Sequence, residues 1–272
     1  MRGYFRRFLR FARVSTTWLL VTSMLLYGPV PAFAATPSAA PDGNWSLTQE
    51  MLLTGTVNDT NPCTAAAAVS GCRAVVGTYG DKAKGLYAGA AFIWERNGET
   101  WIQKAKLLAS DGGASDYFGY SVAVSGDTAV VGAYRDDDKG TDAGAAYVFT
   151  RNGDGTWTQK AKLLASDGGA FDYFGCSVAV SGDIAAVGAS NDDDKGTNAG
   201  AAYAFLQDAN GTWTQQTKLL ASDGGGSDYL GCSVAVSGRT VVAGAYGDDD
   251  EGSDAGAAYV FTGDGFNWTQ KR

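Results

Sequence analysis

Short runs of apolar residues, or of strictly alternating apolar and polar residues, recur along the chain and predict β-strands. Residues Trp157–Leu164 alternate between the two faces of an extended segment. Apolar runs follow at Val178–Val180, Ile184–Ala189 and Gly200–Phe205, separated by turns rich in Gly, Asn and Asp. No stretch of any length has apolar residues at helical spacing. The pattern therefore predicts a unit of four short strands.

This unit is repeated at a nearly constant spacing. The tryptophans that begin successive repeats are 56, 56, 56 and 55 residues apart: Trp45, Trp101, Trp157, Trp213 and Trp268. Between them the words Lys-Leu-Leu-Ala-Ser-Asp, Ser-Val-Ala-Val-Ser-Gly and Ala-Gly-Ala-Ala-Tyr recur. Four antiparallel strands per repeat are the makeup of a propeller blade, because radial repetition leaves only short edges. We predict an all-β protein, a β-propeller of four-stranded blades with about four repeats of ~56 residues.

The first 34 residues have the pattern of an export signal. Five arginines and no acidic residue precede the apolar stretch Trp18–Tyr27, and an Ala-x-Ala site ends at Ala34. The apolar stretch is too short for a membrane-spanning helix. We predict cleavage after Ala34 and a protein that is secreted or held at the cell surface or in the periplasm, with an uncleaved anchor as the alternative. The predicted organisation is a signal peptide at 1–34, a linker at 35–44 and a propeller at 45–272, with repeats at 45–100, 101–156, 157–212 and 213–267 and the start of another at 268–272.

Two segments compete for the outermost strand of the last blade. Trp45–Leu53 matches that strand, and its pairing with residues 232–262 would close a four-bladed ring by a clasp that removes an open edge. Trp268–Lys271 matches the same strand. We expect the clasp, with an open arc as the alternative.

Composition and charge narrow the possible functions. The sequence has no histidine, which excludes Ser-His-Asp and Cys-His nucleophiles and His-ligated zinc or haem. The net charge of −8 becomes −13 without the first 34 residues, since 16 basic residues then face 29 acidic ones. Such a surface repels nucleic acid and anionic lipid. We predict no nucleic-acid partner and no membrane contact after signal cleavage.

Three short sequence motifs in each repeat resemble those of a known family. Phe118-Gly119, Val131-Gly132-Ala133 and Gly144–Phe149 are similar to the FG-GAP repeat, the blade unit of integrin α-chain propellers and their bacterial relatives. The resemblance covers Trp45 to Arg272 and implies a propeller for extracellular adhesion or binding, often stabilised by calcium. In the integrin type, a D-x-D-x-D-G calcium loop lies between the F-G and G-A-P words. This chain has only the tight turn Ser125-Gly126-Asp127 there, so the family's calcium residues are not carried over to that loop.

The acidic residues lie in other loops, and strand direction predicts that they share one face. Antiparallel strands alternate direction, so the loop with Asp111 and Asp116 lies at the same end as the loop Asp136–Asp142. Clustered carboxylates suit Ca²⁺, and extracellular sites need an affinity of only about 10⁻⁴ to 10⁻³ M. A solvated acidic loop, partly neutralised by Lys139 or Lys195, is the alternative. The candidate ligands are Asp136, Asp138, Asp142, Asp192, Asp194, Asn198, Asp248, Asp250 and Asp254.

Four cysteines are candidates for disulfides in an exported protein. Cys63 and Cys72 are close in sequence and form the candidate pair. Cys176 and Cys232 occupy equivalent places in successive repeats, where a bridge and a pair of buried thiols are equally expected.

The function class follows from the repetition itself. The acids recur from repeat to repeat, although the first repeat keeps only Asp81 in the loop of three aspartates, whereas a catalytic site breaks repeat symmetry with an unusual residue. We therefore predict an exported, non-catalytic binding or adhesion module with an extracellular protein or glycan as its ligand. A structural fragment of a longer secreted array is the alternative, and a propeller glycosidase that uses paired carboxylates is a distant third.

Overall fold

The computed structural model describes residues 64–271. The predicted signal peptide, the linker, the segment Trp45–Leu53 and Cys63 lie outside the described residues. Within residues 64–271 every regular element is a strand, and no helix is long and apolar enough to span a membrane. The predicted all-β class is thereby confirmed.

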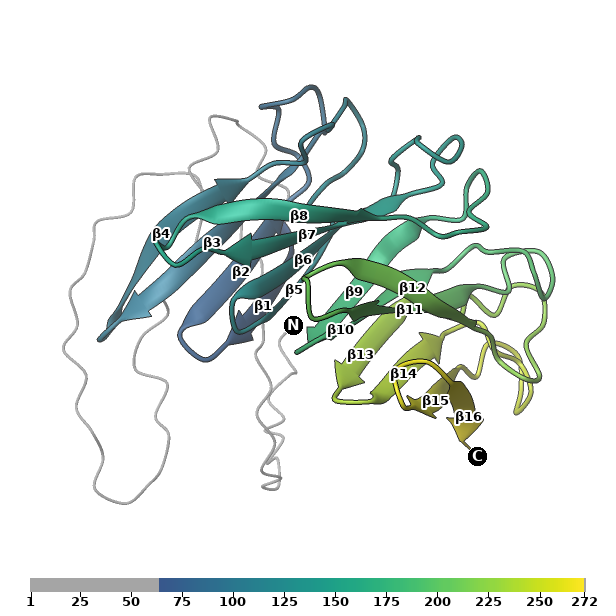
Figure 1. The fold of residues 1–272 in the computed structure, drawn as a ribbon. Helices are drawn as coiled ribbons and strands as arrows, with labels where there is room; N and C mark the ends of the chain where they lie inside the picture. The colour runs from purple at the N-terminus through teal and green to yellow at the C-terminus, as the bar shows by residue number, and fades with distance from the viewer. Residues whose placement is uncertain (1–63, 272) are drawn as a thin grey trace, which may run out of the picture. The chain divides into compact units, whose positions relative to one another are not determined.

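The strands form four antiparallel sheets, each a meander of four consecutive strands (Figure 1). The first sheet comprises β1 (Thr64–Ser70), β2 (Arg73–Thr78), β3 (Ala90–Asn97) and β4 (Thr100–Leu107). The second comprises β5 (Ser121–Ser125), β6 (Thr128–Ala133), β7 (Ala145–Arg151) and β8 (Trp157–Leu163). The third comprises β9 (Phe174–Ser181), β10 (Ile184–Ala189), β11 (Ala201–Gln207) and β12 (Trp213–Leu219). The fourth comprises β13 (Ser233–Ser237), β14 (Thr240–Ala245), β15 (Ala257–Gly263) and β16 (Trp268–Lys271).

The sheets are out of phase by one strand with the tryptophan-to-tryptophan repeats. Each tryptophan strand is the last strand of a sheet, so Trp268–Lys271 completes the fourth sheet. It pairs with β15 from Gly263↔Trp268 to Val260↔Lys271. The clasp was expected to fill this place with Trp45–Leu53, but β16 fills it. A strand that follows its partner through a short turn loses far less chain entropy than a segment some 200 residues away.

Consecutive sheets pack face to face through small residues. At Gly188 an added Cβ would lie 1.9 Å from the Gly231 oxygen of the next sheet, and at Gly132 it would lie 2.1 Å from the Gly175 oxygen. Three apolar clusters fill the interfaces between the first and second, second and third, and third and fourth sheets. Fully buried Phe174 illustrates this packing, since its ring lies edge-on to Tyr203 with centroids 5.4 Å apart.

The thiols of Cys176 and Cys232 are not bridged in the structure. The Cys232 thiol lies 3.3 Å from the Gly244 oxygen, and the Cys176 thiol lies 3.5 Å from the Gly188 oxygen. Burial raises the pKa of Cys176. The pair is therefore unbridged, and both cysteines are half-buried. Cys72 is exposed in the turn after β1, and its pairing with Cys63 stays a prediction.

Candidate binding face

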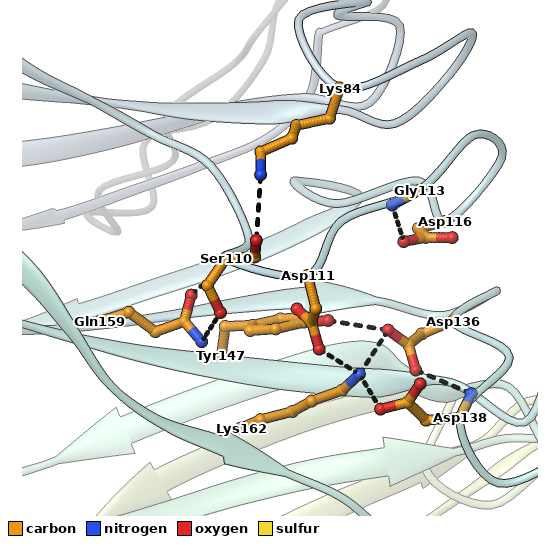
Figure 2. Close-up of polar contacts among 10 residues, drawn as sticks. All are labelled: Lys84, Ser110, Asp111, Gly113, Asp116, Asp136, Asp138, Tyr147, Gln159 and Lys162. Atoms are coloured by element: carbon orange, nitrogen blue, oxygen red, sulfur yellow. Dashed lines mark hydrogen bonds and ion pairs between the residues drawn. The ribbon is translucent and has the colours of Figure 1, made fainter.

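Two kinds of acidic loop lie at the same end of the sheets, as strand direction predicts. One precedes the first strand of a sheet, and the other follows its second strand. In the second sheet one ammonium links them (Figure 2). The Lys162 Nζ lies 2.8 Å from Asp111 in the loop before β5, and 2.8 Å and 2.5 Å from Asp136 and Asp138 in the loop after β6. We call Asp111, Asp136 and Asp138 the second acidic cluster, and the equivalent triads the third and fourth clusters.

A buried tyrosine completes this arrangement. The Tyr147 hydroxyl donates a hydrogen bond of 2.7 Å to Asp136, and the Lys162 Nζ lies 5.3 Å from the centroid of the Tyr147 ring. Burial raises the pKa of Tyr147, and the charge of Asp136 raises it further. Burial alone would lower the pKa of Lys162, but hydrogen bonds to the three carboxylates outweigh burial and raise it. The ammonium therefore stays charged and fixed between the two loops.

The third acidic cluster repeats this geometry. The Lys218 Nζ lies 2.9 Å from Asp167, 2.6 Å from Asp192 and 2.6 Å from Asp194. The Tyr203 hydroxyl donates to Asp192 at 2.9 Å. In the first sheet, by contrast, Lys106 contacts the single carboxylate of Asp81 at 2.7 Å, and Phe92 replaces the tyrosine.

The fourth acidic cluster differs, because no lysine of residues 64–271 contacts it. Its members are Asp223, Asp248 and Asp250, and the Tyr259 hydroxyl donates to Asp248. The charge of Asp248 raises the pKa of Asp250, and burial raises it further.

The predicted metal ligands divide into two groups. Asp136, Asp138 and their equivalents belong to the acidic clusters, whose centres hold an ammonium in the second and third sheets. Asp142 and Asn198 instead adopt left-handed backbone conformations with φ of 53° and 57°, which Asp and Asn tolerate better than most residues. Asp254 is equivalent to them, with φ of 49°. Within residues 64–271 no group of three or more Asp, Glu or Cys side chains is arranged to hold a metal ion. Calcium binding stays a prediction.

The lysines that neutralise the acidic clusters were predicted wrongly. Lys139 and Lys195, within the acidic loops, are exposed, whereas Lys162 and Lys218 come from the outermost strands. The recurring motif Lys-Leu-Leu-Ala-Ser-Asp contained the signal for these lysines. Side chains of a strand alternate between its two faces, so the lysine lies on the face opposite to the buried leucine that follows it.

A cluster of tyrosines lies in the same loops and was missed by the sequence analysis. The tyrosine cluster comprises Tyr79, Tyr117, Tyr120 and Tyr134. Ring centroids are 4.4 Å apart for Tyr120 and Tyr134, 5.4 Å for Tyr79 and Tyr117, and 6.0 Å for Tyr79 and Tyr120. The Arg135 guanidinium lies 5.1 Å from the Tyr117 ring and 5.4 Å from the Tyr134 ring. Burial raises the pKa of Tyr134.

Tyr120 of this cluster and the neighbouring Arg135 break the repeat symmetry. Cys176 and Cys232 stand where the second sheet has Tyr120, and Asn191 and Gly247 stand where it has Arg135. The sequence signal was therefore the departure from the repeated word rather than the word itself.

The backbone that presents the tyrosines is strained in the same way three times. Tyr117, Tyr173 and Tyr229 all have φ of 58°, a region that bulky residues rarely adopt. A hydrogen bond to the preceding sheet accompanies this conformation, since the Tyr117 N–H donates to the Tyr87 oxygen at 3.0 Å. Strain that the surroundings enforce is typical of functional loops.

Several solved structures align with about three quarters of this chain. A protein from Lactobacillus plantarum aligns with a TM-score of 0.47 and 16% identity, over 76% of this chain and 54% of that one. The computationally designed Ika4 protein aligns with a TM-score of 0.43 and 15% identity, over 76% of this chain and 95% of that one. Sqt1 of Saccharomyces cerevisiae aligns with a TM-score of 0.44 and 11% identity, over 77% and 47%. The chain thus spans about half the length of the first and third.

No curated protein matches the sequence. The profile of the FG-GAP repeat matches three consecutive segments, residues 101–149, 157–205 and 213–261, which together make up just over half of the chain. Each segment begins at the tryptophan of an outermost strand and ends in the third strand of the following sheet. The chain belongs to the FG-GAP repeat family, and its four-stranded sheets are blades of a β-propeller.

Proposed function

We propose that this protein is an exported, non-catalytic binding module that uses its tyrosine cluster to hold an extracellular protein or glycan. The observation that carries the proposal is the asymmetric cluster of Tyr79, Tyr117, Tyr120 and Tyr134 beside Arg135. Residues that recur in the repeats are explained by packing, whereas Tyr120 and Arg135 occur in one repeat alone and need a separate reason. Export rests on the N-terminal signal pattern of the sequence.

The chemistry of the cluster suits recognition. Tyrosine offers a large rigid ring and a polar hydroxyl while losing little conformational entropy, so it is frequent in protein interfaces. Tyr120 is exposed, and the other three rings are half-buried, so they are held in place and still reach solvent. Arg135, whose guanidinium lies 4.0 Å from Asp142, adds a cation beside the rings, which favours ligands with anionic or hydroxyl groups.

The absence of catalysis is part of the same proposal. In the second and third sheets the paired carboxylates already accept hydrogen bonds from a fixed lysine and a buried tyrosine. Burial alone would raise the pKa of Asp111 and of Asp167, but hydrogen bonds from Lys162 and Lys218 lower these pKa values. General acid catalysis in glycosidases instead uses a carboxyl group with a raised pKa.

We also propose that calcium contributes little in the second and third sheets, because it would have to displace Lys162 or Lys218. The fourth acidic cluster has no such competitor among the described residues. A thermal melt in millimolar calcium, against chelator and with magnesium as control, tests this. A calcium-specific shift that persists in the D250N variant would contradict it.

The binding proposal is tested with a glycan array and with capture from a cell-surface fraction. Wild-type protein is compared with Tyr120→Ala and Arg135→Ala. Phe266→Ala is the matched control, since Phe266 is also an exposed ring but lies in the turn between β15 and β16 at the opposite end of the sheet. We expect Tyr120→Ala and Arg135→Ala to lose at least tenfold in affinity for the same ligand. Equal retention by all four proteins would contradict the proposal.

A further inference from the structure

A row of four tyrosine rings crosses the loops of the first three sheets. The rings of Tyr87 and Tyr117 are parallel, with centroids 5.5 Å apart. The Tyr134 centroid lies 5.5 Å from that of Tyr117 and 5.4 Å from that of Tyr173. We call Tyr87, Tyr117, Tyr134 and Tyr173 the tyrosine row. It extends the aromatic surface beyond the tyrosine cluster in both directions along the sheets.

Departures from the repeat pattern make this row. One repeat further along the chain, the residues equivalent to Tyr87 and Tyr134 are Asp142 and Ser190. The row therefore ends at Tyr173. Because the third sheet forms without a ring at either place, packing of the repeats does not account for the tyrosines at these positions.

The rings of the row are held in place and still reach solvent. All four tyrosines are half-buried. The backbone N–H groups of Tyr117 and Tyr173 donate to oxygens of the preceding sheet's loops, at 3.0 Å and 3.3 Å. Aromatic rings that are positioned before a ligand arrives lose little conformational entropy on binding. The row is thus a preformed aromatic surface.

Hydrogen-bond donors and acceptors lie beside the rings. The Arg135 Nε donates to the Tyr134 hydroxyl at 3.2 Å, and the Arg135 guanidinium lies 4.0 Å from Asp142. The Asp142 N–H donates to the carboxylate of Asp137, which is exposed. Guanidinium groups only donate and carboxylates only accept, whereas a phenol hydroxyl does both. A ligand matches this set when its own polar groups both donate and accept.

Two other classes of extended ligand fit these groups less well. A proline-rich peptide packs on aromatic rings, but it offers carbonyl acceptors and few N–H donors, so it leaves Asp137 and Asp142 without partners. A polyanionic chain meets these two carboxylates and a protein of net charge −8. A neutral sugar chain has apolar C–H faces for the rings and hydroxyls that donate and accept.

We propose that the tyrosine row binds a neutral glycan chain of several pyranose units. The C–H faces of the sugars pack on the rings, and their hydroxyls bond the phenol, guanidinium and carboxylate groups beside the row. This inference rests on the proposed binding function and narrows its ligand to one chemical class. Each further sugar along the chain meets another ring, so affinity should increase with chain length.

The probes are neutral hexasaccharides and disaccharides of glucose, mannose, galactose and xylose, in α and β linkage. They are titrated into the full protein by calorimetry, with polygalacturonate and a proline decamer as the anionic and peptide comparisons. We expect at least one neutral hexasaccharide to bind at least tenfold more tightly than its disaccharide. Its affinity should change by less than about twofold between low and high salt, because the ligand carries no charge.

Variants are matched to residues that the chain already has at equivalent positions. Tyr134→Ser introduces the residue found at Ser190, and Tyr87→Asn introduces that found at Asn198, whose φ of 57° equals that of Tyr87. We expect Tyr134→Ser to weaken the hexasaccharide about tenfold and Tyr87→Asn, at the end of the row, about threefold. Tyr246→Ser is the control, since Tyr246 is an exposed ring at the equivalent position of the fourth sheet but outside the row. It should leave binding unchanged, and circular dichroism checks that all variants fold.

Several results would overturn the proposal. They are no binding of any neutral hexasaccharide, equal affinity for a hexasaccharide and its disaccharide, tighter binding of polygalacturonate or the proline decamer, and equal losses in all three variants. If no neutral glycan binds while Tyr120→Ala still loses ligand capture, the glycan class is wrong and the proposed function stands. If Tyr120→Ala also retains capture, both proposals are wrong.

Discussion

The third and fourth sheets carry the same words but differ in what covers them. Both contain Ala-Gly-Ala-Ala-Tyr, at residues 199–203 and 255–259. Ala202 is fully buried against the fourth sheet, whereas the equivalent Ala258 is exposed. Gly200 forms a backbone bridge to Leu230 of the next sheet, whereas Gly256 is exposed. Identical sequence therefore gives a core position in one sheet and a surface position in the next.

The same contrast holds for charge. The third acidic cluster is neutralised by Lys218, whereas the fourth holds three carboxylates without a described lysine. What stabilises a repeat in this protein is thus contributed by its neighbours along the chain. The contrast can be tested with pairs of variants at equivalent positions.

The largest difference is expected for alanine at the interface glycines. In Gly188→Ala the new Cβ would meet the Gly231 backbone oxygen at 1.9 Å, and in Gly244→Ala the nearest atom is the Ser233 hydroxyl oxygen at 2.5 Å. A hydroxyl rotates away, but the backbone of the next sheet does not. We expect Gly188→Ala to lose about 3 kcal/mol of unfolding free energy and Gly244→Ala to lose less than about 1 kcal/mol.

Urea unfolding followed by tryptophan fluorescence measures both losses. The slope of the transition must match that of the wild type for the midpoints to be compared. Equal losses would show that the third and fourth sheets pack alike in solution.

Removal of the central lysine is expected to cost less. Lys218→Met leaves Asp167, Asp192 and Asp194 without their ammonium, and Asp192 is buried. The loss should lie between that of a surface pair and that of a fully buried pair, at about 2 kcal/mol. The control is Lys271→Met on β16, for which we expect little change because this exposed lysine contacts no described carboxylate.

The pH dependence of this loss has a defined sign. Burial alone would raise the pKa of Asp167, but the hydrogen bond from Lys218 outweighs it and lowers the pKa below 3.8. Its stabilisation is present above pH 3.8 and is lost as the pH falls through the lower folded value. The pKa of Lys218 is raised above 10.5, so its contribution persists below pH 10.5 and is lost at higher pH. Wild type and Lys218→Met should therefore differ most between these limits, and a constant difference across the whole range would contradict this assignment.

The sequence predicted the strands well and the interactions between loops only in part. Alternation and turn residues located β9, β10 and β11, because those signals are local. Strand direction also placed Asp111 beside Asp136. The partner of these acids was not predictable in the same way, since Lys162 follows Asp136 by 26 residues and reaches it across the sheet. The tyrosine cluster was missed because its rings come from two different sheets, β1–β4 and β5–β8.

The smallest expected change in unfolding free energy gives the clearest test, because its sign should be opposite in the third and fourth sheets. Asp194 forms an ion pair with Lys218 at 2.6 Å, so Asp194→Asn should lower the unfolding free energy by about 0.5 kcal/mol, as expected for an exposed pair. Asp250 occupies the equivalent place and is contacted by no lysine of residues 64–271, and the charge of Asp248 raises its pKa. A raised folded pKa means that ionisation of Asp250 opposes folding near neutral pH, so Asp250→Asn should slightly raise the urea midpoint. The rise should vanish at pH 3, where Asp250 is protonated in both states, and it should shrink in high salt. A loss of stability in both variants would show that the fourth acidic cluster is neutralised in solution by a cation of its own.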